Sequence, residues 1–257
     1  MVEHPKIEKI DLIRIFFRSF FLQSVWNYQT LLSVGFAFAL MPASKVLYKD
    51  KAGRIEFLRR HLNFFNAHPY FASYALGAIT RIEEEITNGK AELHQVEKLK
   101  NALIGPLGAL GDQMFWGTIK PAAILLGVIV VLITHDISTF LYLFIVLLLL
   151  YNIPHLYIRY YGIVDGYNKG FEVYKIISLD RYKKYRSFYI GLGAASLGFV
   201  ISYSFLKYEL NNIYQGLVFA GCVVVAFYFH KLKRSFYRNV LFSLLAAVLF
   251  GIIVESI

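Results

Sequence analysis

The sequence predicts an all-α integral membrane protein, with amphipathic N-terminal helices, a re-entrant hairpin and about five transmembrane helices. Three observations lead to this fold class. Hydrophobic residues make up 57% of the 257 residues and charged residues only 17%, whereas soluble domains carry about 25% charged residues. Five apolar runs follow Lys120, and the apolar stretch just before it is interrupted by Gly, Pro and Asp. We therefore expect two parts: residues 1–120, with amphipathic or core helices and the hairpin, and residues 121–257, with the transmembrane helices.

Amphipathic helices are expected in the first hundred residues. Residues 54–65 carry apolar side chains at helical spacing, with Arg and Asn on other faces. Pro69 should end or kink this helix, because proline disfavours helical geometry in the residue before it. A second helix is predicted at about residues 70–87, closed by an Asn-Gly pair, and a third at about residues 91–104. Residues 12–40 are apolar and aromatic but contain several amides, which predicts an interfacial or partly inserted hairpin.

A re-entrant hairpin is predicted at about residues 101–120, within the sequence NALIGPLGALGDQMFWGTIKP. Gly105-Pro106 and Gly111-Asp112 lie six residues apart there, a pattern that a lipid-facing helix does not favour. Irregular backbone at membrane depth is tolerated only where protein or a water-filled cavity satisfies its polar groups. Broken helices of this kind recur at transporter binding sites, so part of a membrane transporter is the first functional hypothesis.

The predicted transmembrane helices correspond to five apolar runs, at about residues 122–134, 137–153, 188–206, 213–229 and 240–254. A straight crossing of the bilayer needs about 20 residues. The first run is short by that measure, and whether it forms a full crossing is left open. Cys222 is the single cysteine and lies inside an apolar run. This excludes an intrachain disulfide and a Cys-based metal site, and predicts a buried packing residue.

The net charge of +10 is expected to reflect membrane topology rather than nucleic-acid binding. Basic residues gather beside apolar runs, mainly at residues 159–186 and 231–238. Cytoplasmic loops of membrane proteins carry an excess of Lys and Arg, so both segments are expected to face the cytoplasm. The connections at residues 135–136 and 207–212 are short and nearly neutral, and should face outward. The expected result is a multi-pass chain with a cytoplasmic N-terminus and a C-terminus outside.

Several short motifs occur in a fixed order over residues 12–170. They are Arg18-Ser19, QSVWNY at 23–28, Gly35-Phe36, Met41-Pro42, RHL at 60–62, FFNAHP at 64–69, Gly77, Glu83-Glu84, GPLxxxGDxxFWGTxxP at 105–121, YYG at 160–162 and GYNKG at 166–170. In these residues the chain resembles the IID membrane subunit of the mannose/fructose/sorbose-type phosphotransferase systems. The last third departs from the usual pattern, because no Gly-rich stretch follows Lys169 and the connection at 207–212 is short.

The resemblance implies a non-catalytic subunit of a sugar transporter in the bacterial plasma (inner) membrane. In that family the IIC and IID membrane subunits form the sugar-translocation unit, and IIC–IID pairs associate into a higher oligomer. Phosphate passes through the soluble IIA and IIB carriers, and IIB phosphorylates the incoming sugar. The implied partners are therefore IIC, the IIA/IIB phosphocarriers, membrane lipid and a mannose-type hexose or similar sugar. No cofactor is implied, and the sequence has no phosphate-binding GxxxxGK[ST] loop.

Asn66 and His68 are candidate sugar contacts, because they stand where the helix before Pro69 should break. An amide offers both donors and an acceptor, which suits neutral sugar hydroxyls. Contact with another subunit and stabilisation of a local turn are the alternatives for this pair. Glu84 is a further candidate, with an interfacial or gating role, although three consecutive acids usually form a solvated face.

Asp112 and Trp116 are the candidate sugar contacts within the predicted hairpin. An ionised side chain in a membrane segment costs about 2.5–3.5 kcal/mol on insertion scales and usually faces a cavity or partner. Asp112 is therefore expected either to bind a sugar hydroxyl or to cap a helix in the hairpin. Trp116 should pack the hairpin, lie at the membrane interface or stack on the sugar ring. The residues expected to have structural roles in the hairpin and in ending the preceding helix are Gly105, Pro106, Gly111, Gly117 and Pro69.

Two other functional classes are weighed against transport. The divergent last third is compatible with an orphan membrane scaffold, receptor or regulatory subunit without bulk transport. His61, His68 and Glu84 raise the idea of an intramembrane metalloenzyme. Their spacing lacks the HExxH pattern of zinc hydrolases, so neither a metal site nor a catalytic residue is expected.

Overall fold

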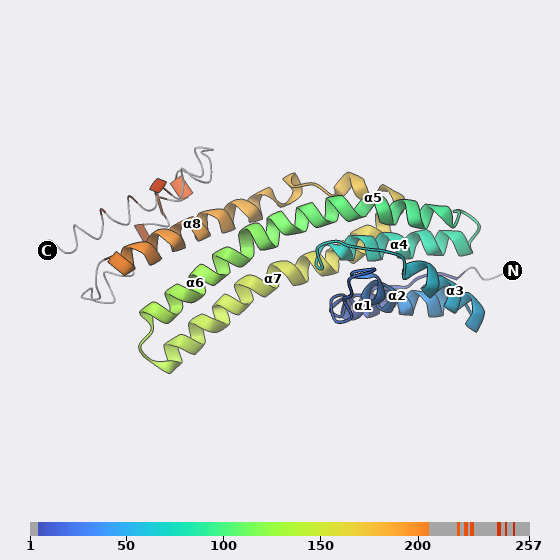
Figure 1. Ribbon diagram of the computed structural model, residues 1–257, viewed down its shortest axis with the longest axis horizontal. Coiled ribbons are helices and arrows are strands. Elements are labelled where there is room, and N and C mark those ends of the chain that lie inside the picture. Colours follow the sequence, from blue (N-terminus) through green and yellow to red (C-terminus); the bar gives the residue numbers. More distant parts are fainter. Residues whose placement is uncertain are drawn as a thin grey trace. The chain divides into compact units, whose positions relative to one another are not determined.

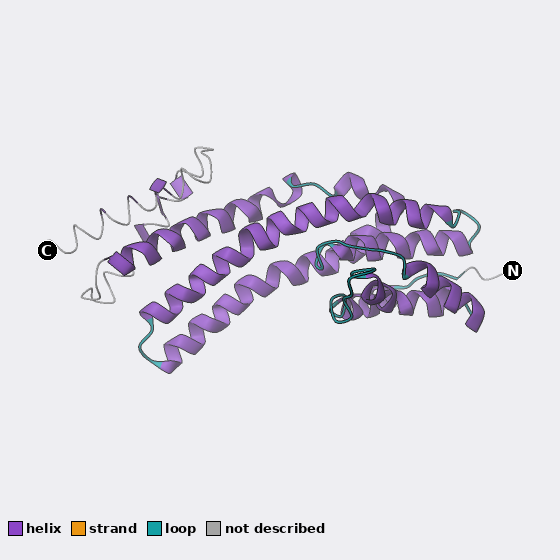
Figure 2. Cartoon of the chain, viewed as in Figure 1, coloured by secondary structure: helices purple, strands orange, loops and turns teal. Residues whose placement is uncertain are grey.

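The computed structural model describes residues 5–205 and positions 220, 221, 224, 225, 227, 228, 241, 242, 245 and 249. Within these residues the chain is helical apart from short connections, and it has isolated bridges but no β-strands (Figure 2). The predicted all-α class is therefore confirmed for the part that is described. The runs predicted at 213–229 and 240–254, the basic segment at 231–238 and Cys222 fall outside these residues wholly or in large part.

The helices follow one another along the chain with few interruptions (Figure 1). They are α1 (Lys9–Ser19), α2 (Ser33–Leu47), α3 (Lys51–His61), α4 (Ala72–Thr87), α5 (His94–Gly111), α6 (Lys120–Ile133), α7 (Ile137–Lys169) and α8 (Lys183–Phe205). A π-helix, Asp112–Ile119, joins α5 to α6, and 3₁₀ segments occupy Gly170–Ile176 and Asp180–Tyr182. Helix α4 lies close to the prediction for residues 70–87, and Gly89 after it has a φ of +68°, which is the left-handed conformation typical of a residue after a helix.

The chain divides into two compact units. One comprises Met1–Asp112 with Pro154–Arg181, and the other comprises Gln113–Ile153 with Tyr182–Ile257. The division predicted from the sequence, at about residue 120, stays a prediction.

Helix α4 is the centre of the first unit. It contacts α1, α2, α5 and the 3₁₀ segment Gly170–Ile176, and twelve of its sixteen residues are buried. A helix that is covered on all sides in this way organises the core around it. The largest fully buried side chains of this unit are aromatic: Phe36, Phe57, Phe65, Phe71 and Tyr74.

Small residues allow α4 to touch α7 backbone to backbone within this unit. A Cβ added at Gly77 would overlap the Ile163 carbonyl oxygen, and one at Gly166 would overlap the Tyr74 carbonyl oxygen. The Ser73 hydroxyl fills the remaining space, because it donates to the Tyr70 carbonyl at 2.7 Å and lies 3.3 Å from the Ile158 carbonyl oxygen. The second half of α7 is thereby fixed against α4.

The second unit packs α6 against α8. Ile129 meets Ala194, Ala195 and Phe199 in its core. The Tyr203 hydroxyl donates to the Leu132 carbonyl at 3.2 Å, so this buried hydroxyl has an acceptor.

The prediction of a re-entrant hairpin at residues 101–120 is wrong. His94–Ile133 forms one continuous helix of 40 residues, in which Pro106 lies inside α5 and the FWGT sequence lies in the π-helix. The wide turns of the π-helix accommodate the irregular sequence without reversing the chain, and the Thr118 hydroxyl donates to the Gln113 carbonyl, five residues earlier, at 2.8 Å. Apart from the backbone of its own helix and its chain neighbours, no atom of the described residues lies within 4 Å of the place that a Cβ would occupy at Gly105, so that glycine serves no tight turn.

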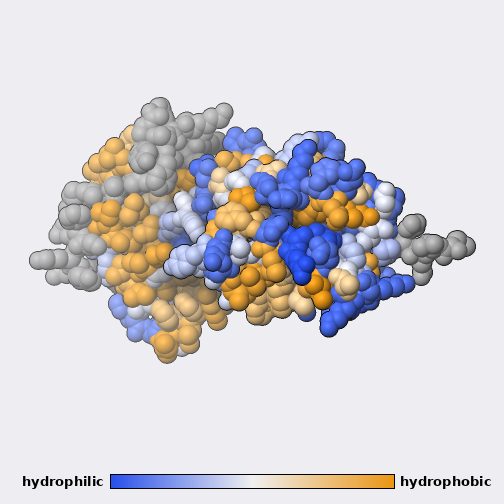
Figure 3. All heavy atoms as spheres, turned by 45° about the vertical axis from the view of Figure 1, so that its right-hand side comes forward, coloured by the Kyte–Doolittle hydropathy of each residue, from blue (hydrophilic) through white to orange (hydrophobic). Residues whose placement is uncertain are grey.

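Two helical segments, His94–Ile133 and Ile137–Ile176, are long and apolar enough to cross a membrane among the described residues. The short apolar run at 122–134 is thus the last part of a longer helix, which begins at His94. None of the residues in the most apolar stretch of Ile137–Ile176 is buried, and hydrophobic residues gather in large patches on the face of the molecule drawn in Figure 3. Exposed apolar surface on this scale indicates contact with lipid or with another protein. The predicted count of about five crossings stays a prediction.

Candidate functional site

The loop between α3 and α4 carries the FFNAHP motif and is held by backbone hydrogen bonds. The Leu32 amide donates to the Phe65 carbonyl at 3.0 Å, and the Phe65 amide donates to the Thr30 carbonyl at 3.3 Å. The Ala72 amide donates to the His68 carbonyl at 2.8 Å, which starts α4 directly after the turn at Pro69. Pro69 therefore occupies the entry to a helix, where its missing N–H leaves no helical hydrogen bond unmade.

His68 is brought against Gly111 of the GD motif. His68 is buried, and a Cβ added at Gly111 would overlap the Cβ and Cγ atoms of the His68 side chain. Only glycine allows α5 to approach the loop this closely. Two motifs that lie far apart in the sequence thus meet at one place in the first unit.

A polar and aromatic cluster extends from His68 to helix α7. The Tyr70 ring lies 5.0 Å from the His68 ring and stacks on His155 at 4.5 Å. The Arg159 guanidinium lies 5.2 Å from the centre of the Tyr70 ring. It also donates to Ser19 at the end of α1, to the hydroxyl at 3.1 Å and to the carbonyl. The cluster therefore joins α1, the loop before α4, and α7.

His155 and Arg159 are the residues that the sequence interpretation missed. Arg159 was assigned to a cytoplasmic basic segment, but it is buried inside α7, which continues to Lys169. The signal that was available is an ionisable pair within the apolar sequence of α7, because ionisable residues in such helices usually face the protein interior and have a function.

The environment of His68 keeps its imidazole neutral. Burial lowers the pKa of His68 to about 4, and the positive charge of Arg159 acts in the same direction. The Nδ1 atom accepts from the Tyr70 amide at 3.3 Å, so the proton of the neutral ring resides on Nε2. A neutral imidazole with a fixed tautomer is a hydrogen-bonding group rather than a source of charge.

The π-helix carries Asp112 at its start and Trp116 in its middle. Met114 and Phe115 are buried, whereas Asp112 is exposed and the Trp116 side chain is 56% exposed. Asp112 has helical backbone angles and lies within a continuous helix, so its expected role as a helix N-cap is wrong. π-Helical turns inside α-helices occur frequently at functional sites.

The remaining predicted residues occupy different surroundings. Asn66 is exposed in the loop, two residues before the buried His68. Gly105 and Pro106 lie on the exposed side of α5, and Gly117 is exposed in the π-helix. Exposure alone does not test whether a residue contacts sugar, so the assignment of Asn66 and the other candidates to a sugar site stays a prediction.

The consecutive acids of α4 do not form a solvated face, because Glu83 and Glu84 are buried. Arg60 donates to both oxygens of Glu83, from Nε at 2.7 Å and from Nη2 at 2.8 Å, and His61 Nε2 lies 3.0 Å from the same carboxylate. Burial would raise the pKa of Glu83, but the hydrogen bonds to Arg60 and His61 outweigh it and lower this pKa. Burial also lowers the pKa of His61.

Glu84 connects the N-terminal segment to α7. Its Oε2 atom accepts from the Ile7 amide at 2.9 Å and from the Tyr167 hydroxyl at 2.6 Å. Arg81 lies 3.4 Å from the other oxygen. With both oxygens engaged, Glu84 stabilises the packing of the first unit.

Within the described residues the chain is helical, and two of its helices are long and apolar enough to cross a membrane, which is the architecture of helical membrane proteins. The chain belongs to the family described as "PTS system mannose/fructose/sorbose family IID component", whose family model matches residues 6–256.

Several named relatives share the matched region. The mannose-specific EIID component of Escherichia coli K12 is 35% identical over 173 residues, which are 66% of this chain and 59% of that protein. The chain thus spans somewhat less than two thirds of that relative. The fructose permease IID component of Bacillus subtilis is 33% identical over 83% of this chain and 74% of its own length. The sorbose-specific EIID component of Klebsiella pneumoniae is 30% identical over 82% of this chain and 74% of its own length.

A solved structure has a similar fold. In the complex of the mannose transporter ManYZ with microcin E492, one chain matches with a TM-score of 0.58 and 31% identity, over 80% of this chain and 73% of that chain. Because the relatives are named as components of sugar systems, the alternative of a scaffold without transport is not favoured.

Proposed function

We propose that this protein is the IID membrane subunit of a phosphotransferase-system sugar transporter. It forms the sugar-translocation unit with a IIC subunit, and this unit delivers sugar to cytoplasmic IIB. The observation that carries the proposal is the contact between His68 and Gly111. It brings the FNAHP loop and the GD motif, two of the motifs that carry the resemblance to the family, to the same place. The chain itself has no catalytic role in this proposal, and the IIA and IIB carriers transfer the phosphate.

The chemistry of the site suits a neutral hexose of the mannose type. The Nε2–H group of neutral His68 can donate to a hydroxyl group, and the exposed amide of Asn66 can both donate and accept. The exposed carboxylate of Asp112 is an acceptor that can take two hydroxyl donors, and the exposed ring of Trp116 offers an apolar face for a sugar ring. His155 and Arg159 position Tyr70 and His68 from α7.

The proposed location is the bacterial inner membrane, with several crossings, the N-terminus in the cytoplasm and the C-terminus outside. The asymmetric distribution of Lys and Arg along the sequence supports this orientation. IIC–IID pairs that associate into a larger oligomer complete the proposed assembly.

Sugar uptake by cells that express this chain with its IIC, IIA and IIB partners tests the proposal. Asp112→Asn and Asn66→Ala should each reduce uptake about tenfold or more. The first removes the charge that strengthens a hydrogen bond to the sugar, and the second removes the hydrogen-bonding amide. Asp136→Asn is the matched control, since Asp136 lies exposed in the connection between α6 and α7, and it should leave uptake unchanged. Full uptake by Asp112→Asn at normal membrane levels would refute the assignment of this carboxylate to the sugar site.

A further inference from the structure

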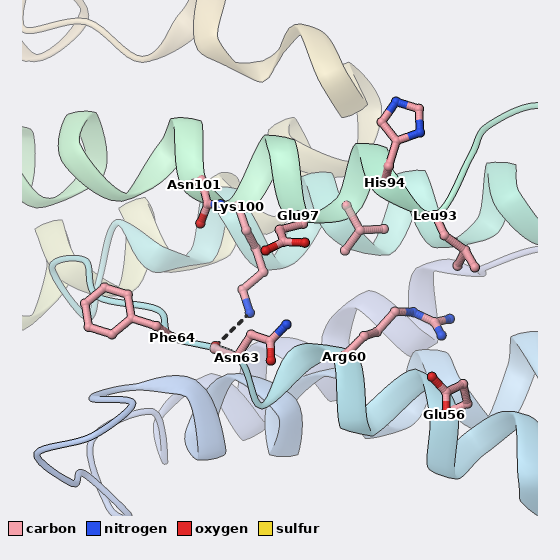
Figure 4. Close-up of a pocket in the computed structure, with 10 residues that line it drawn as sticks. Glu56, Arg60, Asn63, Phe64, Leu93, His94, Glu97, Lys100 and Asn101 are labelled. Atoms are coloured by element: carbon pink, nitrogen blue, oxygen red, sulfur yellow. Dashed lines mark hydrogen bonds between the residues drawn. The ribbon is translucent and has the colours of Figure 1, made fainter.

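A pocket outside the proposed sugar site lies between α5 and the end of α3 with the loop that follows it (Figure 4). Its volume is about 380 Å³, within the range of pockets that hold small molecules. The residues that decide its chemistry are Arg60, Asn63, Glu97, Lys100 and Asn101. None of them belongs to the sugar contacts proposed above.

Lys100 supplies a buried positive charge to this pocket. The residue is 3% exposed, and its Nζ atom lies 3.1 Å from the Asn63 carbonyl oxygen and 3.3 Å from that of His61. The rings of Phe36 and Phe65 also lie near this ammonium, with centroids 5.4 and 5.8 Å from Nζ. An ammonium group has three donors, so two backbone acceptors leave one donor without a hydrogen-bond acceptor among the described residues. No described carboxylate lies within ion-pair distance of Nζ, although a buried charge is costly unless it is paired.

Arg60 adds a second cationic group. Its Nε and Nη2 atoms donate to Glu83 and the Tyr48 hydroxyl, whereas Nη1 makes no hydrogen bond within the described part of the chain. The side chain is 17% exposed and lines the pocket. Guanidinium and ammonium groups together are the usual protein ligands of phosphate.

The acidic and amide groups of the pocket lie farther out. Glu56 is 64% exposed and pairs with Arg59 at 3.7 Å, and His94 is 66% exposed. Glu97, Asn63 and Asn101 are also exposed. The cations therefore lie deep, and groups that bind hydroxyls surround the opening.

We propose that this pocket binds a phosphate group attached to a polyol. The phosphate would contact Lys100 and Arg60, and the hydroxyls would contact Glu97, Asn63 and Asn101. A soluble sugar phosphate and the headgroup of an anionic lipid such as phosphatidylglycerol share this chemistry. The inference concerns a second site, independent of sugar uptake through Asp112.

Binding to the full chain, purified with its IIC partner, tests the proposal by calorimetry. Mannose 6-phosphate represents the soluble source, and phosphatidylglycerol in mixed micelles represents the lipid source, with free mannose and phosphatidylcholine as the neutral counterparts. Lys100→Gln should weaken binding of the phosphate ligand about tenfold or more, the effect of losing a charge-assisted hydrogen bond. Lys98→Gln, an exposed neighbour on α5, should stay within about twofold of the wild type, as expected for a group outside the pocket.

Asn101→Asp keeps the test valid if Lys100→Gln does not fold. It places a negative charge at the opening while the buried ammonium stays in place, and it should weaken binding of the phosphate ligand. Binding of either phosphate ligand, with this charge dependence, supports the proposal and identifies the source. The proposal is overturned if neither phosphate ligand binds, or if the neutral counterpart of the ligand binds equally well. Because Asp112→Asn should not change this binding, failure here is distinguishable from failure of the proposed transport function.

Discussion

The absence of a side chain at Gly111 decides how closely α5 approaches the loop that carries His68. The motif in the sequence was recognisable, but its glycine was assigned to the turn of a hairpin. In the structure the same residue removes an overlap with a buried imidazole. A sequence shows that a glycine is present but does not show which atoms lie where its Cβ would be.

Gly111→Ala should therefore destabilise the protein, whereas Gly105→Ala should not. The added methyl group at 111 must displace His68, and overpacking of this kind typically costs about 1–3 kcal/mol. At Gly105 the methyl group meets no described atom within 4 Å beyond its chain neighbours and its own helix backbone, and alanine in a helix is favoured over glycine by up to about 1 kcal/mol. Thermal unfolding in detergent measures both effects, and equal stability of the two variants would contradict the contact at Gly111.

The pH dependence of stability should report on His68. The pKa of this group falls from 6.5 in the unfolded chain to about 4 in the folded chain. A group whose folded pKa is depressed contributes stability above the unfolded pKa, and this stability is lost as the pH falls toward the folded pKa. This shift in pKa corresponds to a loss of about 3 kcal/mol in the free energy of unfolding at the limit of low pH. His61 acts in the same direction, because burial also lowers its pKa.

Melting temperatures should thus be steady near pH 7 and fall between pH 6.5 and 4. His68→Gln removes one titrating group and should make this decline shallower than in the wild type. Lys and Arg residues do not titrate in this window. An unchanged slope in His68→Gln would mean that folding does not lower the pKa of this imidazole.

At the scale of elements, the sequence predicts that helices are present better than how they connect. The second helix and its Asn-Gly end are close to α4 as observed. The Gly and Pro residues before Lys120 were interpreted as a chain reversal, although a helix can retain Pro106 at the loss of one hydrogen bond and can widen into π turns. The burial of Glu83 could not be predicted either, since its partners Arg60 and His61 come from α3, more than twenty residues away in the sequence.

Glu83 holds α3 against α4, and its replacement tests that connection. Glu83→Gln would leave the Arg60 guanidinium without its carboxylate, and breaking a buried pair costs about 3–5 kcal/mol. Glu85→Gln is the matched control on the same helix, because its pair with Arg81 is partly exposed and such pairs contribute about 0–1 kcal/mol. Denaturant unfolding should separate the two variants clearly, and a cost below about 1 kcal/mol for Glu83→Gln would contradict a structural role for this network.

For the whole molecule, composition alone predicts the membrane environment, because 57% of the residues are hydrophobic. The structure adds where that apolar surface remains uncovered. The most apolar part of Ile137–Ile176 has no buried residue, so water would contact a continuous apolar helix unless lipid or another subunit covers it. The sequence could not distinguish this helix from a buried core helix, because both are apolar along their length.

Cysteine labelling measures which environment covers this helix. In a Cys222→Ser background, Ile145→Cys lies on the uncovered part of α7 and Lys90→Cys lies in the exposed turn after α4. A maleimide reacts with the thiolate, which forms in water and not in hydrocarbon. In membranes opened to both sides, Cys at 145 should therefore react about tenfold or more slowly than Cys at 90. After denaturation in detergent the two should react equally, which excludes an intrinsic difference between the thiols. Equal rates in intact membranes would place α7 in water and would remove the physical basis for a membrane-spanning subunit.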